Sequence, residues 1–80
     1  MPAKLDDIDT KLKLAIAIRL KELRSSQGKK QKDFAYDLGR DKQSVNKNEQ
    51  GKGATIYTVN KFCKEIGISL SDFFNDPIFK

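Results

Sequence analysis

Residues 31–51 read Gln31-Lys32-Asp33-Phe34-Ala35-Tyr36-Asp37-Leu38-Gly39-Arg40-Asp41-Lys42-Gln43-Ser44-Val45-Asn46-Lys47-Asn48-Glu49-Gln50-Gly51. The first part of this stretch has its apolar residues, Phe34, Ala35 and Leu38, at the spacing of one helix face. Gly39 follows directly, and glycine is the residue that most often ends a helix. A short helix is therefore predicted over about residues 31–38.

The segment after this turn predicts a second helix with an unusual surface. Asp41 is suited to cap its start, and Gly51 lies just past its end. Its one apolar side chain is Val45, although a helix packed inside a small domain normally has a broad apolar face. At about 100° per residue, Val45 and Glu49 share one side of this helix. The other side gathers amides and lysines without a carboxylate, namely Lys42, Gln43, Asn46, Lys47 and Gln50.

Such a side suits the edges of DNA base pairs. Amide side chains can form two hydrogen bonds to adenine, and lysine can donate to the acceptors of guanine in the major groove. A helix, a tight turn and an outward-facing second helix together form a helix-turn-helix. An ordinary solvated helix face is the alternative when the amides and lysines are considered alone.

The charge of the chain points in the same direction. The 80 residues carry a net charge of +5. Between residues 19 and 52, ten basic side chains face five acidic ones, and the flanking segments are neutral. This concentration indicates an anionic partner for the segment. A merely soluble, lysine-rich surface is the alternative.

The composition argues against an enzyme. Histidine is absent and Cys63 is the one cysteine, so no catalytic site, metal site or cofactor is predicted. The longest apolar run, Leu14–Ile18, is far shorter than the roughly 20 residues of a membrane span. The start of the chain lacks the apolar stretch of a signal peptide. We expect one cytoplasmic domain over residues 1–80 that does not bind a membrane.

A longer helix is predicted before this region, from about Asp9 to Gln27, with Asp9 or Thr10 as its cap. Leu14 and Ile18 form a second ridge on this helix. Its main apolar stripe recurs at intervals of four, four and three residues and consists of Leu12, Ile16, Leu20 and Leu23.

Two further helices are predicted towards the C-terminus. Thr55 is suited to cap the first, and Gly67 to end it. Ser69 and Asp72 have the spacing of a capping box for a last, short helix. No segment alternates apolar and polar residues long enough to predict a strand, so the fold class is all-α. The apolar residues of the longer helix are Ile56, Val59, Phe62, Cys63 and Ile66.

Four segments in register, Leu20–Arg24, Gln31–Gly39, Ser44–Lys52 and Ile66–Phe74, resemble the Cro/CI-type helix-turn-helix family. The resemblance covers about residues 16–74, which leaves an N-terminal extension of residues 1–15 and a short tail of residues 75–80. It implies a five-helix, lambda repressor-like DNA-binding domain whose helix-turn-helix is formed by the second and third helices.

The resemblance also implies roles for individual residues. Arg24 and Glu49 match a structural salt bridge of the family, and Glu49 shares the inward side with Val45. Gln31 matches a glutamine that contacts a phosphate and supports the third helix. The expected base-reading residues are Lys42, Gln43, Asn46 and Lys47. Contacts to the DNA backbone are expected from Gln31, Ser44, Lys30, Arg40, Lys52 and Gly53.

The chain departs from the family pattern at three positions. Lys30 stands where most relatives have a serine or threonine cap, which predicts a weaker start of the second helix. Lys29 replaces a usual leucine, so one core contact is expected to be missing. Asn48 replaces a usual apolar residue, so the third helix is expected to be less firmly anchored.

These observations predict a sequence-specific regulator of transcription that binds double-stranded DNA, most simply a homodimeric repressor. The alternative is an antitoxin-type protein that neutralises a toxin-like partner protein and binds DNA to regulate its own synthesis. Two apolar surfaces are candidates for pairing with a second copy. One is the ridge of Leu14 and Ile18, and the other consists of Phe74, Ile78 and Phe79.

Overall fold

The computed structural model describes residues 2–80, and their side chains from residue 7 onward. The described part contains helices and no strand. The elements are α1 (Pro2–Ser26), α2 (Gln31–Leu38), α3 (Lys42–Glu49), α4 (Ile56–Ile66), α5 (Leu70–Phe74) and a 3₁₀ turn, η1 (Pro77–Phe79). The five α-helices confirm the predicted all-α fold class.

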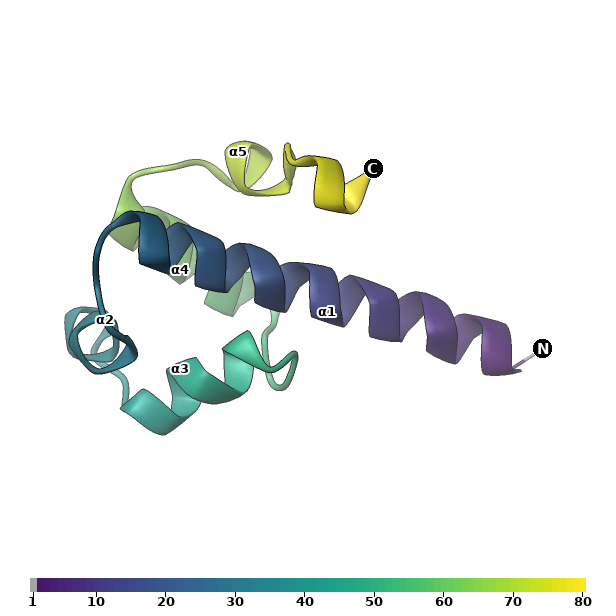
Figure 1. Cartoon of the computed structure of the whole chain (residues 1–80), viewed down its shortest axis with the longest axis horizontal. Helices are drawn as coiled ribbons and strands as arrows, with labels where there is room; N and C mark the ends of the chain where they lie inside the picture. The colour runs from purple at the N-terminus through teal and green to yellow at the C-terminus, as the bar shows by residue number, and fades with distance from the viewer. Residues whose placement is uncertain (1) are drawn as a thin grey trace.

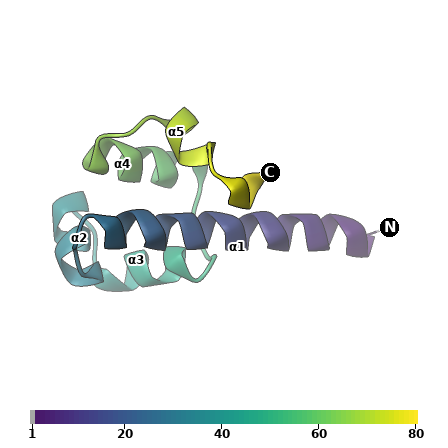
Figure 2. The ribbon, with the colours of Figure 1, turned by 45° about the horizontal axis from the view of Figure 1, so that its top comes forward.

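The longest helix, α1, organises the other elements. It runs between two layers, with α2 and α3 on one side and α4, α5 and the C-terminal turn on the other (Figures 1 and 2). The N-terminal half of α1 extends past the loop that follows α3 (Figure 1).

The ends of the shorter helices follow the predicted local signals. Gly39 and Gly67 end α2 and α4 with φ angles of 69° and 82°, in the left-handed region that glycine adopts without strain. Ser69 and Asp72 form the predicted capping box of α5. The predicted start of α1 at Asp9 or Thr10 is wrong, because α1 already begins at Pro2. Proline suits the first turn of a helix, where its missing N–H costs no hydrogen bond.

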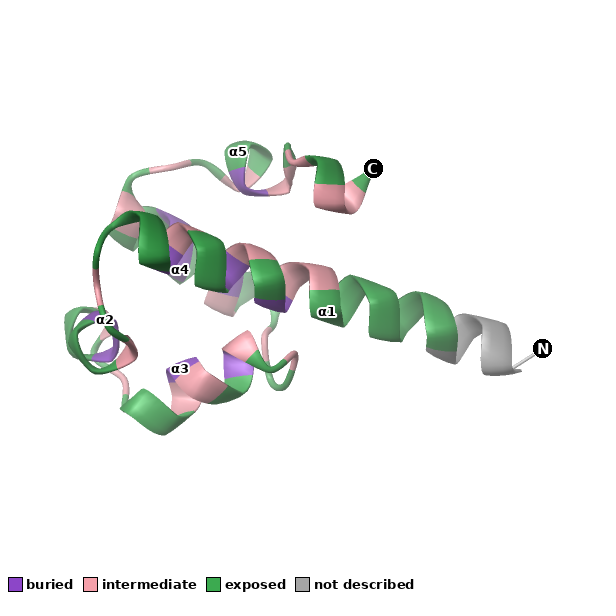
Figure 3. Ribbon diagram, in the orientation of Figure 1, coloured by how far each residue is buried: buried purple, intermediate pink, exposed green. Residues whose placement is uncertain are grey.

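The core lies where α1, α2, α4 and α5 meet. The rings of Phe34 and Phe62 are tilted against each other with centroids 4.8 Å apart, and Phe73 meets Phe62 edge-on. Figure 3 marks buried residues on each of the five α-helices, whereas residues 7–14 of α1 are exposed. The principal buried cluster consists of Leu20, Phe34, Val59, Phe62, Cys63 and Phe73.

Part of the predicted stripe of α1 lies outside this core. Leu12, the first residue of the stripe, is 50% exposed. Ile16 and Leu23 pack against the core and Leu20 belongs to it. Ala17, which the stripe did not include, is buried, because a small side chain lets neighbouring elements approach α1 closely.

Arg19 joins the C-terminal segment to α1. Its guanidinium donates to the backbone carbonyls of Phe73 at 2.9 Å and Asp72 at 3.1 Å, and it lies 3.2 Å from the Asp76 carboxylate. Phe74 and Phe79 then pack against the core. This part of the expected pairing surface is therefore used within the chain.

Cys63 is fully enclosed in the core, and its burial raises the pKa of the thiol. None of the helices described here is sufficiently long and apolar to cross a membrane.

Candidate nucleic-acid interface

The turn between α2 and α3 sets the direction in which α3 leaves the domain. After Gly39, the backbone N–H of Arg40 donates to the carbonyl of Ala35 at 2.8 Å. Asp41 then caps α3, because its carboxylate accepts a hydrogen bond from the Ser44 N–H at 2.7 Å. Hydrogen bonds from Ser44 lower the pKa of Asp41 below its ordinary value. The predicted cap is thus present, and it fixes the first turn of α3.

The inward side of α3 is held by one apolar and two polar anchors. Val45 is 4% exposed and packs into the domain. The Glu49 carboxylate accepts hydrogen bonds from Arg24 Nε at 2.6 Å and Arg24 Nη2 at 3.0 Å. The expected pair of Arg24 and Glu49 is therefore present as a two-point ion pair, which fixes orientation as well as distance.

Asn48 is the third anchor, and the sequence pattern did not indicate this role. The side chain is 6% exposed; it donates to the carbonyl of Lys52 at 2.9 Å and accepts from Arg40 Nη1 at 3.2 Å. The expectation that Asn48 loosens α3 is wrong. Its amide offers both a donor and an acceptor, so it joins the turn before α3 to the loop after it.

Gln31 connects α2 to the polar side of α3. Its Nε2 donates to Asn46 Oδ1 at 3.2 Å and to Glu49 Oε1 at 3.0 Å. An amide nitrogen carries two hydrogens, so both donors of Gln31 are used inside the protein. This arrangement supports α3 as expected. Of the side-chain amide of Gln31, only the oxygen Oε1, an acceptor, is left for outside groups. A phosphate contact through Nε2 would require one of these bonds to open.

The outward side of α3 carries the expected base-reading residues together. Lys42, Gln43 and Lys47 are exposed, and Asn46 is half-buried because it bonds Gln31. A shallow surface hollow of about 320 Å³ lies beside this face. It is lined by Gln31, Lys42, Gln43 and Asn46.

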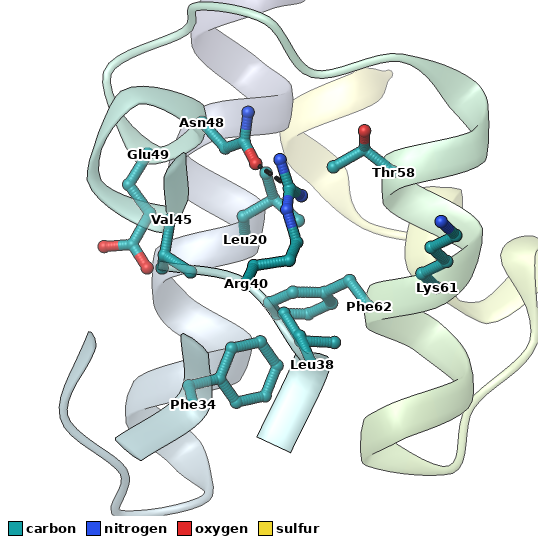
Figure 4. Close-up of a pocket in the computed structure, with 10 residues that line it drawn as sticks. All are labelled: Leu20, Phe34, Leu38, Arg40, Val45, Asn48, Glu49, Thr58, Lys61 and Phe62. Carbon is teal, nitrogen blue, oxygen red and sulfur yellow. Dashed lines mark hydrogen bonds between the residues drawn. The ribbon is translucent and has the colours of Figure 1, made fainter. Parts of the chain in front are cut away.

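The residues expected at the DNA backbone lie around this face, except that the Arg40 side chain bonds within the protein. Lys30 precedes α2 as an N-cap without a side-chain cap bond. Lys52 and Gly53 are exposed at the opposite end of α3, and Gly53 has a φ of 69°. Arg40 is half-buried and turns towards Asn48, beside a small cavity between the turn and α4 (Figure 4). Ser44 is half-buried in the first turn of α3.

Lys29 does not belong to the buried core, and its side chain lies in a partly exposed ion pair. Its side chain pairs with the Asp37 carboxylate, which raises the pKa of Lys29, and its backbone carbonyl accepts from Arg24 Nη1 at 2.6 Å. Arg24 therefore joins α1 both to α3 and to the segment that precedes α2. Across residues whose positions the structure gives, no group of three or more metal-binding side chains is found.

Comparison with known proteins identifies the domain. The chain matches the Cro/C1-type HTH DNA-binding domain over residues 19–77. Neither the curated proteins nor the solved structures gave a match. The match includes α2, α3 and the turn between them, as well as α4 and α5. The chain therefore belongs to the Cro/C1-type HTH DNA-binding domain family.

Proposed function

We propose that the protein is a sequence-specific regulator of transcription that binds double-stranded DNA as a homodimer and represses by occupying its site. The observation that carries this proposal is the outward side of α3. It presents lysine and amide groups without a carboxylate, while Arg24, Gln31 and Glu49 hold the opposite side in place. A rigid helix with donors and acceptors on one side is what base reading in the major groove requires.

In this proposal each base-reading residue of α3 has a partner of defined chemistry on the DNA. Gln43 is exposed and free to form two hydrogen bonds to adenine, and Lys42 and Lys47 donate to guanine acceptors. Asn46 contributes chiefly through its Nδ2, because Gln31 already donates to its Oδ1.

Binding to the backbone would come from both ends of the helix-turn-helix. Lys30 lies at the start of α2, and Lys52 and Gly53 follow α3, so these groups flank the base-reading side. Ser44 and Arg40 are assigned to the same role, Arg40 after release from Asn48. Such contacts supply affinity and its dependence on salt rather than sequence preference.

A two-fold dimer accounts for how so small a domain reaches useful specificity. Members of this structural class bind two half-sites about one helical turn apart. A dimer bound over a promoter blocks access to it, which is the simplest route to repression. In this proposal the protein acts in the cytoplasm.

The test is selection of bound duplexes from a random DNA pool, followed by a reporter assay with the selected site. We expect a two-fold symmetric motif and lower reporter expression when the protein is present. A pool with no enriched motif would contradict sequence-specific binding. Stoichiometric co-purification with a small protein, combined with weak DNA preference, would instead favour the antitoxin-type alternative.

A further inference from the structure

Four side chains form a continuous line of hydrogen bonds from the inside of the domain to the outward side of α3. Arg24 donates to both oxygens of the Glu49 carboxylate. Oε1 of Glu49 also accepts from Gln31 Nε2 at 3.0 Å, and the same nitrogen donates to Asn46 Oδ1 at 3.2 Å. This line, here called the amide relay, begins at the buried Arg24 and ends in the surface hollow that Gln31 and Asn46 line.

The charge at the inner end of the amide relay decides how each amide is turned. The side chain of Glu49 is 4% exposed and is paired with Arg24, so it is a carboxylate, which accepts hydrogen bonds and has no hydrogen to donate. Only the NH₂ end of Gln31 can therefore face it. The second hydrogen of this nitrogen needs an acceptor on Asn46, because two facing NH₂ groups cannot bond to each other. Asn46 must present its oxygen to Gln31, which leaves its Nδ2 for outside partners.

We infer that the amide relay makes Asn46 a hydrogen-bond donor that selects guanine, and that Gln31 is the positioning residue that sets this preference; the inference rests on the proposed function. Guanine has two acceptors, N7 and O6, at its major-groove edge, and Nδ2 carries two hydrogens to donate to them. Adenine pairs with asparagine through one donor and one acceptor together. Because Oδ1 is turned towards Gln31, the oxygen and the nitrogen of Asn46 do not both face the base.

The same bonds determine how Gln31 acts on the DNA. Both hydrogens of its Nε2 are used inside the protein. Its remaining polar atom, Oε1, is an acceptor and offers nothing to a phosphate oxygen, which is also an acceptor. The effect of Gln31 on binding therefore passes through Asn46, and through it the buried pair of Arg24 and Glu49 influences a base contact on the far side of α3.

Selection of bound duplexes from a random DNA pool, repeated with variants, tests this inference. The position that loses its preference in Asn46→Ala is the one that Asn46 reads, and in the wild-type motif it should be guanine. Gln31→Met removes the donor and keeps a side chain of similar length, so Asn46 can turn both its ends to the base. The ratio of guanine to adenine at this position should then fall at least about fivefold, the lower end of what one well-formed base pairing contributes to discrimination.

Two further variants separate positioning from support of the fold. Gln31→Lys keeps donors and no acceptor, so it should keep the guanine preference that Gln31→Met loses. Gln27→Met, at an exposed glutamine just after α1, is the matched control and should retain the wild-type motif. Circular dichroism should show that all of them are folded. Adenine at the Asn46 position of the wild-type motif would overturn the inference, as would an equal loss of preference at every position in Gln31→Met.

Nuclear magnetic resonance of the free protein tests the amide relay without DNA. The NH₂ hydrogens of Gln31 should exchange with water more slowly than those of Gln27, because both are hydrogen-bonded. Exchange as fast as at Gln27 would overturn the inference. Slow exchange at Gln31 with no enriched motif would reject the proposed function alone. An enriched motif that is the same in wild type and Gln31→Met would reject the positioning role alone.

Discussion

Arg24 and Glu49 are joined by two hydrogen bonds, 2.6 and 3.0 Å long, that tie α1 to the end of α3. Glu49 also accepts from Gln31, and Arg24 also donates to the carbonyl of Lys29. This pair is therefore the junction at which α1, α2 and α3 are held in one orientation.

Glu49→Ala should destabilise the domain by about 3–5 kcal/mol, because it leaves the Arg24 guanidinium buried without its charge partner. This is a large share of the stability of a small domain. Urea unfolding followed by circular dichroism measures the loss. The double variant Arg24→Met with Glu49→Leu should lose less than either single change. A Glu49→Ala protein within about 1 kcal/mol of wild type would show that the pair contributes little.

Asn48→Ala should destabilise the protein by about 1–3 kcal/mol, because the Lys52 carbonyl and the Arg40 guanidinium each lose a partner. Asn48→Leu is the matched variant; it should lose less, since leucine fills the space next to Val45 with apolar contacts. Urea unfolding distinguishes the two. Equal losses would indicate that hydrogen bonding, and not the filled volume, is what Asn48 provides.

Asp41→Asn should reduce stability at neutral pH and have little effect in acid. The pKa of Asp41 is lowered in the folded protein by hydrogen bonds from Ser44. The charged form therefore stabilises the fold above the ordinary pKa of an aspartate, about 3.9, and this contribution is lost as the pH falls through the lower, folded value. Thermal unfolding of both proteins from pH 7 to pH 2 measures the difference. A constant difference between them across this range would contradict the assignment.

Gln43→Ala should relax preference at one base pair of each half-site and cost about 1–3 kcal/mol there. The side chain is exposed on α3, so the fold should be unaffected. Selection from a random pool, repeated with the variant, measures the change. Asn60→Ala, at an exposed amide on α4, is the control and should retain the wild-type motif. Loss of preference at every position would mean that Gln43 supports the helix rather than reads a base.

Lys52→Ala should weaken binding to all duplexes alike and reduce the slope of log affinity against log salt by about one. Its position after α3 suits a phosphate contact. Binding titrations at several salt concentrations measure the slope. Lys64→Ala, an exposed lysine near the end of α4, should leave it unchanged. An unaltered slope in Lys52→Ala would place Lys52 away from the DNA.

Local signals predicted most of this fold. The caps at Asp41, Thr55 and Ser69 each accept the expected backbone hydrogen bond, because a cap depends only on residues close in the chain. Gly39 and Gly67 mark helix ends for the same reason. The starts of α3, α4 and α5 were therefore predictable from their caps, whereas Asp9 and Thr10 lie inside α1, which begins at Pro2.

Features set by distant contacts were not predictable in the same way. Leu12 fits the apolar stripe of α1, yet it is 50% exposed, and the loop after α3 lies against Lys13 and Leu14 of the same helix. Arg19 interrupts an apolar run, and only the tertiary structure brings it to Asp72, Phe73 and Asp76. Pro77 lies in the first turn of η1, which Asp76 caps.

In the candidate site, too, some features follow from the local sequence and others from contacts between helices. Its outward residues follow from the polar pattern of α3, and the structure brings them to one face. The bond from Gln31 to Asn46 and the turn of Arg40 towards Asn48 depend on how α2 and α3 cross. A pattern of residue types names the groups available for contact, whereas the hydrogen bonds between helices determine which atoms remain free.

The enclosure of Cys63 gives the chain an internal reporter of its own opening. It is the one cysteine in the sequence, and it lies 1% exposed in the core. A thiol-specific reagent can reach its sulfur only when α4 separates from its neighbours. The labelling rate of the unmodified protein, with and without a DNA duplex, therefore measures how often the core opens and how far a bound ligand suppresses those openings.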